Sequence, residues 1–125
     1  MGFSYNSNHK LITAFLIVGW AIFHFVMRDD DKLEYDNGQK KRVGTTKGNK
    51  NNGTWTWYYD NGRKNIQGKF VDGKRQGIWT TWDENGNVVT ECVYQNDKLN
   101  GPYYLYNNQK GVVYKKVFKN DKPIN

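Results

Sequence analysis

The side chains that could act in catalysis are few, and they are far apart along the chain. Cys92 is the only cysteine, and the two histidines, His9 and His24, lie in or beside an apolar N-terminal stretch. Both serines, Ser4 and Ser7, precede that stretch. Nucleophilic catalysis pairs a Ser or Cys with a His base, and zinc sites use imidazole or thiolate ligands. The polar remainder of the chain has neither His nor Ser, so we predict no nucleophilic triad and no metal site.

The carboxylates give no better candidate for catalysis. The chain has three Glu and nine Asp, and most of the Asp lie beside Asn or Gly in segments typical of turns. The segment 83–87 begins like a calcium loop, but Val88 and Tyr94 stand where that loop needs Gly and Glu. We therefore predict a non-enzymatic protein with no cofactor and no small-molecule substrate.

The composition divides the chain into two parts. Seventeen residues from Leu11 to Met27 contain no Lys, Arg, Asp or Glu, although the mean hydropathy of all 125 residues is −0.92. Residues 29–125 contain 17 of the 19 basic residues and all 12 acidic residues, which gives this part a net charge of +5 (17 − 12). Trp and Tyr beside Lys could stack nucleic-acid bases, but this charge is modest, and we expect no nucleic-acid partner.

The apolar stretch predicts a transmembrane helix over 11–28, after an N-terminal tail over 1–10. At 1.5 Å per residue, 17 residues make a helix of about 26 Å, near the lower limit for crossing a bilayer. A secretory signal peptide and a buried core helix are the alternatives. The first lacks a small-residue cleavage site, because Arg28 and three Asp follow. Trp20 and His24 are four residues apart on one helical face, where the His could bond to headgroups or a partner.

The basic residues on the two sides of this segment favour opposite orientations in the membrane. Lys10 favours an inside N-terminus, whereas Arg28, Lys32 and the run 40–42 favour an inside C-terminus. Long soluble domains cross membranes largely regardless of charge. We predict a single-pass protein of the mitochondrial or bacterial inner membrane, with its polar part facing the intermembrane space or periplasm.

The polar part repeats every 24 residues. Each unit opens with a Gly, carries aromatic residues two and five positions later, and has another aromatic near its end and a Lys just before the next Gly. These positions are Gly53, Gly77 and Gly101; Trp55, Trp79 and Tyr103; Tyr58, Trp82 and Tyr106; Phe70, Tyr94 and Phe118; and Lys74, Lys98 and Lys122. One period earlier, Asp36-Asn37-Gly38 and Lys50 match a degenerate unit. We predict three units over 53–125, after a linker and capping repeat over 29–52.

Each unit is expected to form a β-hairpin. The segment 54–59 consists of β-branched and aromatic residues, and the turn signal Asp60-Asn61-Gly62 follows it at once. In the third unit the Gly comes one residue late, at Gly111, so we expect a longer loop or a bulge there. The fold class is therefore all-β: an antiparallel single-layer β-meander of 24-residue hairpin repeats, preceded by one transmembrane α-helix.

Aromatic residues are expected on both faces of this sheet. Alternate residues of a strand face opposite sides, so Trp55 and Trp57 share one face and Tyr58 lies on the other. No residues remain to build a second layer, so cross-strand aromatic stacking should stabilise the sheet.

The repeated pattern, from the opening Gly through two aromatics and Asp/Glu-Asn-Gly to a final aromatic and Asp/Gly-Lys, resembles the MORN-repeat family, in particular its bacterial variant branch. The resemblance covers residues 33 to 125. It implies an elongated single-layer β-meander that serves in protein interaction, oligomerisation or membrane association, and some bacterial relatives are described as antitoxin-like. It implies no catalytic residue.

Two surfaces are candidates for binding. The aromatic candidates are Trp55, Trp57, Tyr58, Trp79, Trp82, Tyr103 and Tyr106. The basic candidates are Lys50, Lys74, Lys98 and Lys122, which should recur along one edge of the meander. We expect an accessory subunit of a larger membrane complex, such as an energy-transducing one, anchored in lipid and binding other subunits through the sheet. The alternative is a free-standing module that binds anionic lipid or an antitoxin-like partner through the lysines.

Overall fold

The computed structural model describes residues 33–109 and 111–124 of the chain. The predicted tail, the transmembrane helix with Trp20 and His24, and the first residues of the linker lie outside the described residues. Within the described ranges, no helix is long and apolar enough to cross a membrane.

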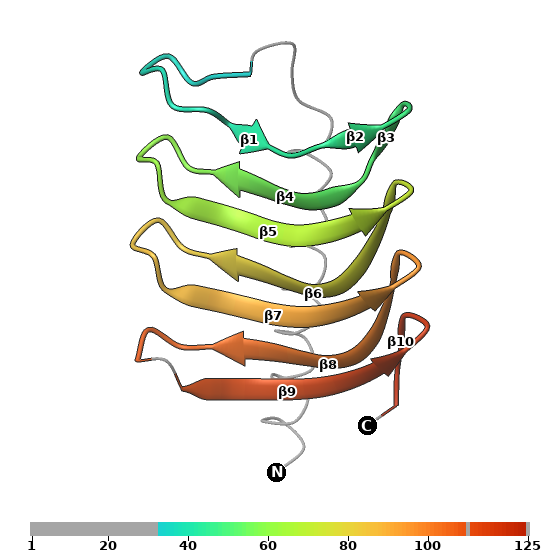
Figure 1. The fold of residues 1–125 in the computed structure, drawn as a ribbon. Helices are drawn as coiled ribbons and strands as arrows, with labels where there is room; N and C mark the ends of the chain where they lie inside the picture. Colours follow the sequence, from blue (N-terminus) through green and yellow to red (C-terminus); the bar gives the residue numbers. More distant parts are fainter. Residues whose placement is uncertain (1–32, 110, 125) are drawn as a thin grey trace. The chain divides into compact units, whose positions relative to one another are not determined.

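The described residues form ten β-strands in two antiparallel sheets (Figure 1). Eight strands form one sheet in the order β1-β4-β5-β6-β7-β8-β9-β10, and β2 pairs with β3 in a small second sheet. The strands are β1 (Arg42–Val43), β2 (Thr46–Lys47), β3 (Lys50–Asn51), β4 (Gly53–Tyr58), β5 (Lys64–Val71), β6 (Lys74–Trp82), β7 (Val88–Gln95), β8 (Lys98–Tyr106), β9 (Val112–Lys119) and β10 (Lys122–Pro123). The prediction of an all-β antiparallel meander is confirmed.

The strands β1 to β4 form an interrupted hairpin that begins in the predicted capping repeat and ends with the first strand of the first unit. One period before β5 lie β1 and β2, separated by Gly44 and Thr45, and one period before β6 lie β3 and β4, separated by Asn52. The backbone N–H of Asn52 donates to the carbonyl of Thr45, so the interrupted strands stay connected across the gap.

The Asn-containing loops that join the two strands within each of the three units have the same length. In each loop the first residue donates its backbone N–H to the carbonyl four residues later: Tyr59 to Arg63, Asp83 to Asn87, and Asn107 to Gly111. Of the two alternatives expected for the third loop, the longer loop is wrong, whereas a bulge is present between Leu105 and Tyr106. The side chain of Asn107 accepts the N–H groups of Gln109 and Gly111 and so holds the loop. A bulge follows the same position in all three hairpins.

The opposite ends of the strands are joined by two-residue turns. Both turn residues have positive φ, at Asp72-Gly73, Asn96-Asp97 and Asn120-Asp121. Such turns match the right-handed twist of the paired strands, and Asn, Asp and Gly tolerate this conformation best. These turns place every unit in the same register on the preceding one.

One face of the sheet, which we call the core face, carries the buried apolar side chains. They are Trp57, Ile66, Phe70, Trp79, Cys92, Tyr103, Leu105 and Phe118. The Phe70 ring lies 6.2 Å from Trp57 of its own unit and 5.0 Å from Trp79 of the next, measured between ring centroids. Aromatic contacts therefore join the first unit to the second.

Candidate interaction surfaces

Strand register divides the seven aromatic candidates between the two faces. Trp55 pairs with Gly68 and Trp57 with Ile66, while Trp79 and Tyr103 both pair with Cys92, which places all four on the core face. Tyr58, Trp82 and Tyr106 have the opposite parity and lie on the other face, which we call the mixed face. The structure therefore does not bring the seven together in one surface.

The core-face tryptophans are held by close contacts with glycine. A Cβ atom added to Gly68 would lie 2.0 Å from the Trp79 ring, and one added to Gly44 would lie 2.0 Å from Trp55. Trp79 donates its indole N–H to the carbonyl of Lys69 at 3.2 Å, and Trp55 donates to Thr45 at 2.8 Å. In the third unit the equivalent pair is Cys92 and Tyr103. These aromatics therefore pack within the sheet.

Burial also determines the chemistry of the core-face thiol and phenols. Burial raises the pKa of Cys92 to about 12, although the nearby Arg75 charge opposes the shift. Burial likewise raises the pKa of Tyr103 to about 12, and the Cys92 thiol adds to that increase. A thiol that stays protonated at neutral pH is a poor nucleophile.

A polar row crosses the mixed face from strand to strand. Register pairs its members in the order Thr56, Gln67, Thr80, Glu91, Tyr104 and Lys115. Gln67 donates its side-chain N–H to the Thr56 hydroxyl at 2.9 Å. The Lys115 ammonium lies 5.6 Å from the Tyr104 ring centroid. The row is thus neutral in the first unit and has one charged residue in each later unit, Glu91 in the second and Lys115 in the third.

Beside this row, the second and third units carry apolar residues on the mixed face. Ile78 pairs with Val93, and Pro102 pairs with Val117. Ile78 is 64% exposed. The equivalent pair in the first unit is Thr54 and Lys69, both exposed. This strip was not predicted from the sequence. Its signal lies in the 24-residue period, because apolar residues replace polar ones at these positions only in the second and third units.

The mixed-face aromatics lie near the Asn-containing loops and have charged neighbours. The Lys64 ammonium is 5.6 Å from the Trp82 ring centroid. The Tyr104 and Tyr106 rings are 6.2 Å apart. Burial raises the pKa of Tyr106, and the negative charge of Glu91 raises it further. Aromatic surface on this face is thus interspersed with both signs of charge.

The four candidate lysines each begin a strand directly after a turn. Lys50, Lys74, Lys98 and Lys122 are all exposed and start β3, β6, β8 and β10. The turns that precede them lie along one side of the array (Figure 1). We call this set the lysine edge.

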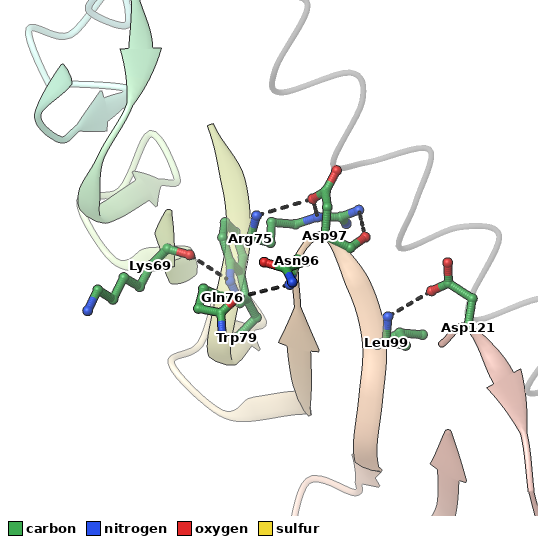
Figure 2. A network of polar contacts seen from close by, with 8 residues as sticks. All are labelled: Lys69, Arg75, Gln76, Trp79, Asn96, Asp97, Leu99 and Asp121. Carbon is green, nitrogen blue, oxygen red and sulfur yellow. Dashed lines mark hydrogen bonds and ion pairs between the residues drawn. The ribbon is translucent and has the colours of Figure 1, made fainter. Parts of the chain in front are cut away.

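Acidic turn residues lie among these lysines and connect the units (Figure 2). The Asp97 carboxylate accepts the Arg75 Nε–H at 2.5 Å, and the Arg75 guanidinium lies 4.1 Å from the Tyr94 ring centroid. One period later, Asp121 accepts the backbone N–H of Leu99 at 2.7 Å. Carboxylates therefore offset part of the positive charge at this edge.

A pocket of about 330 Å³ lies beside the capping repeat. Its lining includes Glu34, Lys40, Arg42, Val43 and Trp55. The lining has one carboxylate and no His, Cys or Ser, so it offers no acid–base pair or nucleophile of the usual kinds. Among residues 33–109 and 111–124, no group of three or more His, Cys, Asp or Glu could hold a metal ion.

Within residues 33–109 and 111–124, the mixed face and the lysine edge both carry accessible side chains, such as Ile78 and Lys74. Comparison with known proteins finds no match to this chain, either among protein-family models or among curated proteins.

Proposed function

We propose that this chain is a non-enzymatic, single-pass membrane-anchored accessory subunit of a larger membrane complex, and that its MORN-like repeats bind other proteins through the mixed face. The observation that supports this function most directly is the strip of Ile78, Val93, Pro102 and Val117. Ile78 is exposed and the other three are half-buried, and accessible apolar residues grouped beside aromatic and charged side chains are typical of protein-binding surfaces. The main strand contacts are between neighbours in the sheet, and they leave Ile78 64% exposed.

Native sizing after extraction in a mild detergent tests this proposal. The full chain should migrate above its monomer mass, with other subunits identified in the same fraction. Ile78→Lys should release the chain from them, because it places a charge in the apolar strip. The matched control is Thr54→Lys, which makes the same change at the equivalent exposed position of the first unit and should have no effect. Migration of the wild-type protein alone as a monomer would refute the proposal.

The proposed location is the inner membrane of a mitochondrion or bacterium, with the repeats in the intermembrane space or periplasm. The apolar stretch 11–27 supports a membrane anchor by its length and lack of charge. Protease added to mitoplasts or spheroplasts should digest the repeats without detergent. Repeats that become sensitive only after detergent is added would face the matrix or cytoplasm instead.

The lysine edge favours a second candidate function, in which a free-standing module binds anionic lipid or an acidic, antitoxin-like partner. Its supporting observation is the exposure of all four lysines along one side of the array. Changing Lys74, Lys98 and Lys122 together to Glu should abolish binding to vesicles containing phosphatidylserine, and high salt should weaken binding by the wild type. Equal flotation of the wild type and the triple variant would exclude the lipid function.

A further inference from the structure

Three side chains on the mixed face form a row with opposite charges at its two ends. Glu91 on β7 and Lys115 on β9 both pair with Tyr104 on β8. The carboxylate and the ammonium group therefore belong to positions on opposite sides of the same tyrosine. Each strand is about 4.8 Å from its neighbour, so the two positions are about 9.6 Å apart.

This arrangement is complementary to itself under a twofold rotation. We consider a second copy placed face to face with the first, with the rotation axis parallel to β8 and passing over Tyr104. The rotation reverses the order of the strands, so β9 of the second copy lies over β7 of the first. Lys115 of each copy then faces Glu91 of the other, and the Tyr104 rings meet at the axis. An isologous interface requires this reciprocity of contacts.

The apolar residues beside the row obey the same symmetry. Val93 on β7 and Val117 on β9 lie on the two sides of Pro102 on β8. Val117 pairs with Pro102, and Val93 lies 3.1 Å from a Cβ position built on the adjacent Gly101. The same rotation therefore places Val93 of one copy against Val117 of the other. In this arrangement apolar side chains meet apolar side chains, and each charge meets its opposite.

We propose that the mixed face of β7, β8 and β9 is a twofold self-association surface whose occupant is a second copy of this chain. The inference rests on the proposed function, because it names a partner for the mixed face. The first unit takes no part, since Thr54 and Lys69 replace the apolar pair there. Two sheets packed face to face in this way align their strands to within about 30°.

Charge reversal tests the predicted pairing in the full chain, with two differently tagged copies co-purified in a mild detergent. Glu91→Lys places like charges opposite each other at two symmetric positions, and Lys115→Glu does the same with negative charges. Each variant should lose self-association by about tenfold. Mixing the two variants should restore it, because the introduced lysine of one copy then faces the introduced glutamate of the other, and the two unchanged residues also face each other with opposite charges. The double variant Glu91→Lys/Lys115→Glu should also associate with itself.

Lys69→Glu is the matched control, since it reverses an exposed charge on the same face of the first unit and should leave self-association unchanged. Melting curves of all variants verify that they fold. If the mixed variants stay apart while each single variant still self-associates, this pairing is wrong. If the wild-type copies do not associate but other subunits co-purify in an Ile78-dependent way, the self-association is refuted and the proposed function stands.

Discussion

At the scale of single residues, the size of a core-face side chain limits the size of the ring that packs against it from the neighbouring strand. Gly68 leaves room for the Trp79 ring, whose nearest atom would be 2.0 Å from an added Cβ. In the following unit, Cys92 replaces the glycine and Tyr103 replaces the tryptophan. A larger residue on one strand is thus matched by a smaller ring on the next, as expected for a closely packed interior.

This matching predicts a non-additive pair of substitutions. Gly68→Cys alone should destabilise the protein by about 1–3 kcal/mol, because the new side chain displaces the Trp79 ring. Adding Trp79→Tyr reproduces the Cys92 and Tyr103 pair of the next unit. The double variant should therefore be more stable, by at least about 1 kcal/mol, than the sum of the two single effects predicts. Urea unfolding of the wild type, both single variants and the double variant measures this coupling. Strictly additive effects would show that the two positions do not share space.

Burial also predicts the reactivity of the single thiol. Because the Cys92 side chain is buried and its pKa is raised to about 12, an aromatic disulfide reagent should label it very slowly in the native protein at pH 8. Addition of urea should give rapid and complete labelling. Rapid labelling without denaturant would contradict the burial of Cys92.

At the scale of strands and hairpins, Phe70 connects two units, whereas Phe118 contacts an aromatic ring of its own unit. Phe70 lies between Trp57 and Trp79, and Phe118 lies 6.2 Å from Tyr103. Phe70→Ala should cost about 3–5 kcal/mol. Phe118→Ala should cost less, because it leaves the contact between the first two units intact. Thermal and urea unfolding of the two variants check this order, and equal or reversed costs would contradict the role of Phe70 in coupling the units.

The sequence allowed much of this arrangement to be predicted, because turn chemistry and strand periodicity act locally. Asn61 and Asn85 recur 24 residues apart, and both lie in loops that join β-strands. The interruption at Gly44 and the equal length of the loop at Asn107 were not predictable in this way, since each depends on contacts made after the strands pair. The mixed-face strip was also missed, because its residues are neither aromatic nor basic and do not recur in the first unit.

At the scale of the whole molecule, the buried Cys92 thiol and Tyr103 phenol predict how the stability of the fold depends on pH. Cys92 and Tyr103 have ordinary pKa values of 9.0 and 10.0, and both are raised to about 12 in the folded chain. Between these values the unfolded chain has lost protons that the folded chain still holds, so the free energy of unfolding must fall as pH rises. Below about pH 8 both groups are almost fully protonated in both states, and they add little pH dependence.

Urea unfolding from pH 8 to 11 measures this dependence. The free energy of unfolding should be flat near pH 8 and should then fall by up to about 1.4 kcal/mol per pH unit for each ionising group. Cys92→Ala should fall less steeply over the same range, whatever its stability at pH 8. Identical slopes for the wild type and the variant would contradict the raised pKa of Cys92.

The contacts between successive units also determine how the chain reaches its fold. The Tyr59 hydroxyl donates to the carbonyl of Trp82, and the Asn61 side chain donates to the carbonyl of Glu84, each pair being 23 residues apart. Pairing over such short sequence separations costs little loop-closure entropy and favours rapid folding. Each repeat leaving the ribosome can therefore pair with the repeat made just before it, so the sheet can grow during synthesis, in chain order, without waiting for the last strand.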